Sequence, residues 1–194
     1  MDKLSLDEKR GFMNYYAAKE MADSFRTVRK NTLIIAQEIP QEKYTFRAAP
    51  ETRSVGELLV HVALAHGFQY QIHATERRTT LEGFDFPSLM KRFTAEEKEP
   101  RSKDQILEML RSSGEKWAGF VEGLSDDFLA ERVQMPPAVT PPSKSRFEMI
   151  LSVKEHEMHH RGQLMLIERL FGIVPHMTRE MQSRLAAVAA AAKS

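Results

Sequence analysis

Apolar residues recur at helical spacing in three long segments of the chain. One stripe advances in steps of three or four residues and comprises Met149, Val153, His156, His160, Leu164, Ile167 and Phe171. A second comprises Leu58, His61, Ala65, Phe68 and Ile72, and a third comprises Ile106, Met109, Leu110, Ser113, Trp117, Phe120 and Leu124. Because an α-helix turns about 100° per residue, such steps keep side chains on one face. Each segment is therefore predicted to be a helix with one buried face, and Trp117 is predicted to lie in the core.

Capping boxes indicate where the helices begin. In this motif a serine hydroxyl accepts a hydrogen bond from one free backbone amide, and a Glu or Gln three residues later satisfies another. The motif occurs at Ser5, Ser54, Ser102 and Ser145. The predicted helices run from residue 6 to Glu38, from Val55 to Arg77, from Ser102 through the third stripe, and from Arg146 to Phe171, and an Ala-rich fifth helix begins at Thr178.

Two connections complete the predicted architecture. Residues 79–101 hold several phenylalanines, so this long crossover is expected to pack on the helices, with a short helix of its own. Residues 134–143 hold four prolines, which are disfavoured inside helices, and they are expected to form a stiff surface loop. Strand patterns are scarce. We therefore predict an all-α fold, an up-down four-helix bundle with a long crossover connection and an extra C-terminal helix, in a single domain over residues 1–194.

The composition excludes several classes of chemistry. Lys plus Arg number 28 and Asp plus Glu number 27, so neither nucleic acid nor an anionic membrane surface is expected as the main partner. No segment approaches the roughly 18 uninterrupted apolar residues of a membrane span, and the first residues lack the apolar run of a secretory signal. The absence of cysteine excludes disulfides, thiolate nucleophiles and iron–sulfur clusters. A cytoplasmic location is expected.

Three histidines fall on the apolar stripes. His156 and His160 lie one turn apart on one face of the fourth helix, and His61 lies on the second helix. A buried imidazole needs partners for both ring nitrogens, and the neighbouring stripe residues are apolar. A metal ion would accept one lone pair from each ring, while each second nitrogen donates to another acceptor. A hydrogen-bonded polar core is the alternative, and the pattern alone does not decide between the two.

The residues around these histidines resemble a known family. The stretches TRSVGELLVHVALAH and HEMHHRGQLMLIERLFGIVP resemble the DinB-like (YfiT-type) family of metal-dependent enzymes, and the similarity covers most of the chain. The resemblance implies a four-helix bundle, a homodimer and a divalent metal site with His61, His156 and His160 as ligands. Arg53 stands where relatives often carry an aromatic residue, a difference expected to affect local packing more than the ligands.

A three-histidine site would support Lewis-acid chemistry. It leaves positions open for water or substrate, and the ion can lower the pKa of bound water to about 7 or bind a thiolate. Zinc and nickel suit imidazole ligands best, with iron, manganese and cobalt as alternatives. Relatives include thiol-dependent S-transferases, so we expect an enzyme acting on a small-molecule substrate, either a transferase that uses a low-molecular-weight thiol or a hydrolase. The alternative is a non-catalytic metal- or ligand-binding stress-response protein.

Other polar residues near the predicted site have simpler interpretations. Glu57 is expected to act as the capping partner of Ser54 more than as a base near His61. Gln163 is expected to form a hydrogen bond across the helix interface more than to orient a ligand. Gly162 indicates either a close approach of helices or space for a ligand. Surface positions are expected for His159 and Arg161, and surface or dimer-interface positions for His66 and His73.

Overall fold

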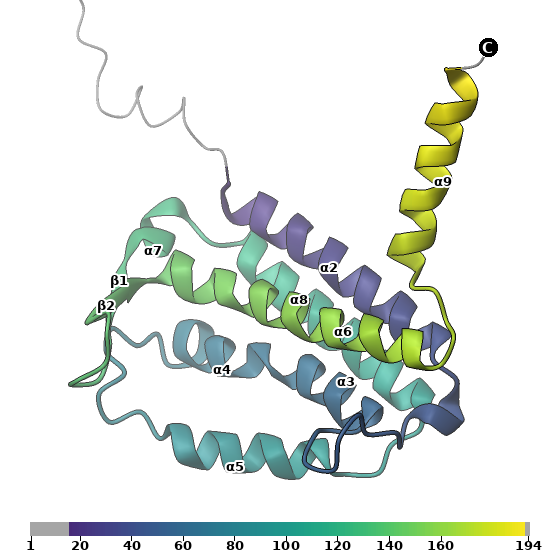
Figure 1. The fold of residues 1–194 in the computed structure, drawn as a ribbon. Helices are drawn as coiled ribbons and strands as arrows, with labels where there is room; N and C mark the ends of the chain where they lie inside the picture. The colour runs from purple at the N-terminus through teal and green to yellow at the C-terminus, as the bar shows by residue number, and fades with distance from the viewer. Residues whose placement is uncertain (1–15, 193–194) are drawn as a thin grey trace, which may run out of the picture.

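The computed structural model describes residues 16–192, which are mainly helical (Figure 1). The longer helices are α2 (Ala18–Glu38), α3 (Val55–Leu64), α5 (Phe86–Glu97), α6 (Lys103–Glu122), α8 (Arg146–Leu170) and α9 (His176–Ala191). The short elements are the 3₁₀ helix η1 (Gln41–Lys43), α4 (His66–Tyr70), the π-helix η2 (Gln71–Thr75), α7 (Asp126–Ala130), and the strands β1 (Arg132–Gln134) and β2 (Ser143–Ser145). The prediction of a helical fold is confirmed.

The core lies where α2, α3, α6 and α8 pack against one another. α2 packs along α6 and α8, and α3 packs against α6, α8 and α5. One apolar cluster centres on Leu59, Leu110 and Leu164, and a second centres on Trp117 and Ile150. The predicted stripes therefore face inward, and Trp117 is buried as predicted.

The helix starts follow the capping boxes. Ser54, Ser102 and Ser145 each accept a hydrogen bond from the backbone amide three residues later, as predicted. The box at Ser5 lies outside the described residues. Within them, α2 begins at Ala18, where the side chain of Glu20 accepts the Ala17 amide and closes the first turn; the part of the predicted helix before residue 16 also lies outside the described residues.

The predicted second helix is continuous in direction but not in geometry. Ala65, between α3 and α4, keeps helical dihedral angles. Beyond Tyr70 the hydrogen bonds widen to the π pattern, as in the bond from the Glu76 amide to the Gln71 carbonyl. π turns of this kind are rare and occur often at functional sites. The helical repeat of apolar residues does not reveal such a widening, and the prediction of one regular helix was wrong here.

The two predicted connections take defined positions. α5 occupies the long crossover and runs beside α3, so the prediction that this segment packs on the bundle is confirmed (Figure 1). The proline-rich segment joins β1 to β2, which pair antiparallel with Arg132 opposite Ser145. This small hairpin leads directly into α8 and fixes where that helix begins.

A buried ion pair sets the rotation of α8. The Arg29 guanidinium donates to both carboxylate oxygens of Glu157, at 2.9 to 3.1 Å, and to the carbonyl oxygens of Leu110 and Val62. Arg29 on α2 thereby joins α3, α6 and α8. A Cβ at Gly114 would lie 2.9 Å from the Arg29 side chain, so the glycine leaves room for it. Since Glu157 follows His156 directly, this pair aims the histidine face of α8 toward α3.

Glu168 is buried without compensation. Its side chain is 0% exposed, and neither carboxylate oxygen has a hydrogen-bond partner among the described residues. Burial, with the nearby Glu38 charge adding to it, raises the pKa of Glu168 to about 7. The group is therefore largely protonated below neutral pH, which avoids an isolated buried charge.

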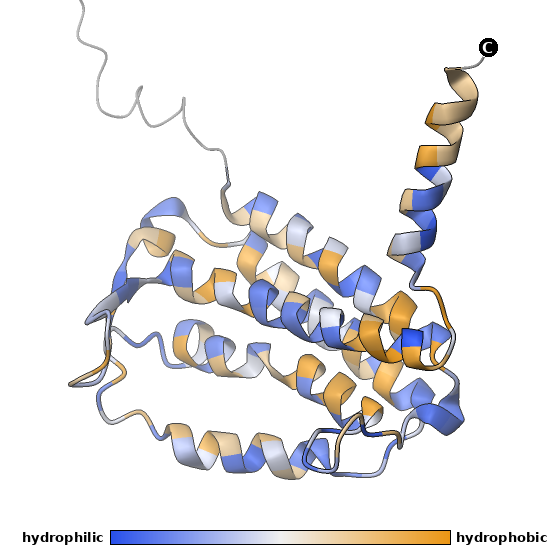
Figure 2. Ribbon diagram, viewed as in Figure 1, coloured by the Kyte–Doolittle hydropathy of each residue, from blue (hydrophilic) through white to orange (hydrophobic). Residues whose placement is uncertain are grey.

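Helix α9 stands away from the bundle (Figure 1). Its base is held by a hydrogen bond between His176 and Asn31 and by another from Arg169 to Thr178. Figure 2 shows apolar residues along its free length. These include Met181, Leu185 and Val188, all of them exposed. No helix in residues 16–192 is both long enough and apolar enough to span a lipid bilayer.

Candidate metal centre

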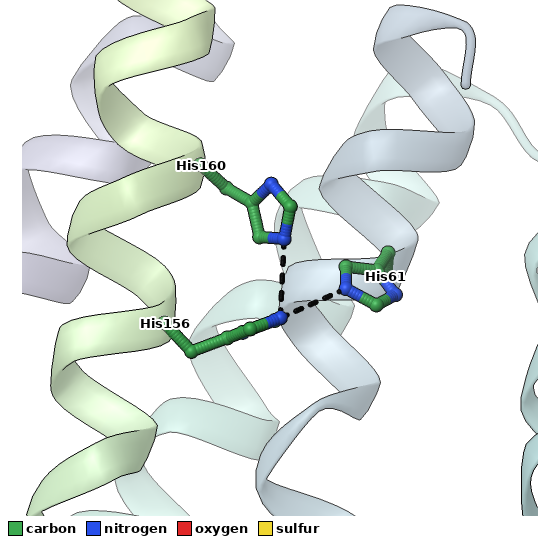
Figure 3. Close-up of side chains that lie close together, drawn as sticks. All are labelled: His61, His156 and His160. Atoms are coloured by element: carbon green, nitrogen blue, oxygen red, sulfur yellow. Dashed lines mark hydrogen bonds between the residues drawn. The ribbon is translucent and has the colours of Figure 1, made fainter. Parts of the chain in front are cut away.

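Three imidazole rings meet between α3 and α8 (Figure 3). His61 projects from α3, and His156 and His160 project from successive turns of α8. The Nε2 atom of His156 lies 3.0 Å from that of His61 and 3.1 Å from that of His160. One nitrogen of each ring lies within 4.8 Å of the other two. The structure thus brings together the three histidines that the sequence singled out.

Hydrogen bonds on the far side of two rings determine which nitrogen faces the centre. His61 Nδ1 lies 2.7 Å from Glu97 Oε1, and His160 Nδ1 lies 2.7 Å from Gln163 Oε1. Both oxygens can only accept, so each Nδ1 is assigned the proton, and each neutral ring presents the lone pair of Nε2 to the centre. The Nδ1 atom of His156 is buried and has no partner among the described residues.

With these assignments, the nitrogen lone pairs at the centre outnumber the protons available to bond to them. A proton on Nε2 of His156 could bond to one neighbouring lone pair but not to both. A divalent cation would accept all three lone pairs. With bond lengths of about 2.0–2.1 Å, a tetrahedral ion places its ligand nitrogens about 3.3 Å apart. The two separations that involve His156, 3.0 and 3.1 Å, need only a few tenths of an ångström of expansion to match this spacing, and the third pair of ligand nitrogens lies within 4.8 Å. The donor set therefore fits a divalent metal.

Burial keeps the α8 histidines neutral. It lowers the pKa of His156 to about 4, and the neighbouring imidazoles act in the same direction. It also lowers the pKa of His160 to about 4, against the opposing hydrogen bond to Gln163. Both rings therefore keep a free lone pair near pH 7, as metal ligation requires.

Glu97 supplies a carboxylate behind His61. It lies at the end of α5 and is buried, and Arg53 donates to it from Nε at 2.6 Å and from Nη2 at 3.3 Å. Burial alone would raise the pKa of Glu97, but the hydrogen bonds from His61 and Arg53 outweigh it and lower the pKa. An ionised carboxylate bonded to a ligand histidine is a common arrangement in metal sites, where it orients the ring and makes it more basic.

Sequence reasoning missed Glu97. The predicted site contained no carboxylate, and Arg53 was expected to matter mainly for packing, whereas it bonds to the acid that holds His61. Glu97 lies on the crossover, where no periodic pattern marks it as inward-facing. Only the packing of α5 on α3 brings it to the site.

Two cavities reach the histidines from different sides. A larger one, of about 870 Å³, has a mixed polar and apolar lining that includes Arg47, Arg53, Glu97, Lys98, His160 and Gln163. A smaller one, of about 290 Å³, is mostly apolar, and its lining includes His61, His156, Phe68, Gln69, Phe86 and Phe93. A small molecule in the larger cavity would meet His160, and one in the smaller cavity would meet His61 and His156.

Several neighbouring residues lie as predicted. Glu57 forms the capping box with Ser54 and also pairs with Arg47. His159 is exposed; its ring packs edge-on against that of His160, and its Nε2 lies 3.2 Å from the side-chain amide nitrogen of Gln163.

Other expectations were wrong. Gln163 orients His160 instead of bridging two helices. A Cβ at Gly162 would meet nothing within 4 Å, so neither a tight helix contact nor an enclosed ligand explains this glycine. His66 and His73 are buried instead of lying on the surface. His66 packs against Trp117, and His73 is held by Gln69 and Arg146, contacts that the sequence spacing did not indicate.

Comparison with known proteins places the chain in a family. A sequence profile of the DinB superfamily matches residues 24–164, which include all three histidines. The chain belongs to the DinB superfamily. A solved structure of a DinB-like protein, YjoA from Bacillus subtilis, is similar with a TM-score of 0.57 and 20% sequence identity, covering 79% of this chain and 92% of YjoA. A search of curated proteins finds no significant match. At that identity the structural likeness supports the fold alone.

Proposed function

We propose that this DinB-superfamily protein is a divalent-metal-dependent enzyme that acts on a small molecule. The proposed ligands are His61, His156 and His160. The observation that carries the proposal is the convergence of three Nε2 atoms, two of them held as lone-pair donors by hydrogen bonds from the opposite ring nitrogens. Zinc or nickel is the preferred ion because both accept imidazole readily.

The protein groups around the histidines divide the remaining tasks. A bound divalent ion would supply Lewis acidity, activating water or a thiolate or polarising a carbonyl group. Glu97 fixes the orientation of His61, and Gln163 fixes that of His160. Lys98, on the wall of the larger cavity, offers a cationic group to an anionic part of a substrate, whereas Arg53 on the same wall is paired with Glu97.

Access to the histidines favours an enzyme over a protein that only stores a metal. A storage site is best closed and saturated by protein ligands, whereas the two cavities here reach the histidines from the surface. Because the chain has no cysteine, a thiol-transfer reaction would need a low-molecular-weight thiol as cosubstrate. Hydrolysis would need only water.

Metal analysis of protein purified without an affinity tag tests the proposal. We expect close to one zinc or nickel per chain, removable by a chelator and restored by dialysis. Cobalt substitution should then give a visible spectrum that added thiols perturb if the reaction is a thiol transfer. A metal content near zero that stays there after dialysis against zinc and nickel would overturn the proposal.

We also propose that the protein forms a homodimer, as the family resemblance implies. Exposed apolar residues on α8 and on the free length of α9 support this, among them Leu166, Leu170 and Leu185. Light scattering after gel filtration should give twice the chain mass for the wild type. Leu185→Glu should shift the protein to monomer, and Ala187→Glu, on the opposite face of α9, should not. A monomeric wild type at micromolar concentration would refute it.

A further inference from the structure

We propose that the smaller cavity binds an apolar or aromatic group bearing a hydrogen-bond acceptor such as a carbonyl oxygen, and that the side-chain amide of Gln69 donates to that oxygen. Its relevance to catalysis rests on the proposed function, because the cavity adjoins His61 and His156. The binding itself can be tested without a metal.

A buried chain of hydrogen bonds fixes the amide of Gln69. Arg146 is 1% exposed, donates to Glu131 Oε2 at 2.8 Å and lies 2.9 Å from His73 Nδ1. Because a guanidinium can only donate, His73 Nδ1 must accept. The proton of the neutral His73 ring is then on Nε2, which lies 3.0 Å from Gln69 Oε1. Burial lowers the pKa of His73 to about 4, consistent with a neutral ring.

This series of hydrogen bonds leaves the side-chain NH₂ group of Gln69 without a partner among the described residues. Gln69 Oε1 accepts from His73, so the NH₂ group of Gln69 must point elsewhere, and it has no partner among the described residues. Gln69 lines the smaller cavity and is otherwise buried. Its nitrogen is not sealed within the protein, unlike the unpartnered Nδ1 atoms of His66 and His156. An oriented amide donor thus faces the cavity.

The rest of the cavity wall is suited to an apolar group. Phe68, Phe86, Met90 and Phe93 line it. A Cβ at Gly67 would lie 3.0 Å from the Phe93 ring, so the absence of a side chain there lets Phe93 pack directly on α4. Apolar walls with few oriented polar groups are typical of small-molecule sites. A volume of about 290 Å³ accommodates a substituted phenyl ring.

The position of the cavity relates this group to the metal centre. His61 and His156 form part of its wall together with Gln69. A carbonyl group whose oxygen bonds to Gln69 would therefore occupy the cavity that two proposed metal ligands line. The larger cavity, which His160 lines, would hold the remainder of the substrate or a second reactant.

Two probes of equal shape test the donor. Acetophenone carries a carbonyl group, and α-methylstyrene replaces its oxygen with a methylene group. Nuclear magnetic resonance titrations with ¹⁵N-labelled protein, in metal-free and zinc-loaded forms, should place both probes at the smaller cavity. Acetophenone should bind about three- to tenfold more tightly, the ratio expected for one neutral hydrogen bond. Only acetophenone should shift the side-chain NH₂ resonances of Gln69 downfield.

Variants provide the matched comparison. Gln69→Met keeps the size of the side chain and removes the donor, and it should abolish the preference for acetophenone while leaving α-methylstyrene binding unchanged. Gln71→Met, on the same helical segment, should preserve the preference. Equal affinities for the wild type, or a preference that survives in Gln69→Met, would overturn the role of Gln69. Absence of binding by both probes to either form of the protein would overturn the cavity as a site. Neither result bears on metal content, so the proposed function would stand or fall separately.

Discussion

Replacing Glu97 with glutamine is expected to weaken zinc binding without removing a proposed ligand. The amide oxygen can still accept from His61 Nδ1, so the ring keeps its tautomer and position. What disappears is the negative charge behind His61, which Arg53 now partly neutralises. The substitution therefore isolates the electrostatic contribution of a group that touches no ion itself.

The magnitude follows from the geometry. Glu97 Oε1 lies 2.7 Å from His61 Nδ1, a length typical of a strong charge-assisted bond. Loss of such partners behind metal-bound histidines typically lowers affinity by about 10- to 100-fold, equivalent to about 1.4–2.7 kcal/mol. Arg53 is more than one-third exposed, so its loss of a partner should add little to the change.

Competition with a chromophoric chelator measures the zinc dissociation constant. Glu51→Gln is the matched control. Glu51 is exposed, lines the same larger cavity and contacts no histidine, so its substitution removes the same charge without touching the site. It should change the dissociation constant by less than about threefold, since exposed charges are screened by solvent. If Glu97→Gln binds zinc as tightly as the wild type, or weakens no more than Glu51→Gln does, the assigned role of Glu97 is wrong.

Three further predictions concern ligation, protonation and the buried ion pair. His156→Ala should abolish stoichiometric zinc binding measured by calorimetry, and His159→Ala should retain it; equal loss in both would argue against the assigned ligands. Glu168 has its pKa raised from 4.5 to about 7 in the folded state, so its contribution to stability is fully present below pH 4.5 and is lost as the pH rises through 7. As the pH rises from 4.5 to 8, the unfolding free energy of Glu168→Gln should therefore increase by on the order of 3 kcal/mol relative to that of the wild type, as measured by urea unfolding. A difference in unfolding free energy that stays constant across this range would contradict the assignment. Arg29→Met should cost about 3–5 kcal/mol because it leaves Glu157 buried and unpaired, and adding Glu157→Met should recover most of that loss, whereas additive losses would refute the explanation.

The helices could be predicted because each depends on local information. Three capping boxes and three apolar stripes lie on the elements that they predicted, since caps and helical faces depend on residues a few positions apart. The π turn after Tyr70 could not be predicted, because both helix types tolerate the same apolar spacing. The hairpin before α8 was missed because its strands have only three residues each, too few for a period-two pattern to stand out from the sequence.

At the site, the residues that could be predicted are those on helices with a periodic apolar sequence pattern. His61, His156 and His160 occupy positions in apolar stripes, where an imidazole is conspicuous. Glu97 was not predictable, because it belongs to a crossover whose path over α3 depends on tertiary packing. The role of Gln163 was misjudged for a different reason, since a side chain three residues from His160 can turn back to it or reach across an interface, and spacing does not distinguish these.

The Nε2 contact between His61 and His156 joins residues 95 positions apart in the chain. An ion bound there would act as a reversible cross-link between α3 and α8, closing a loop that includes the whole crossover and α6. Unfolding would have to release it, so free zinc at about 1,000 times its dissociation constant would add about 4 kcal/mol to the unfolding free energy. Metal supply in the cell would then govern how long each copy survives proteolysis as well as whether it is active.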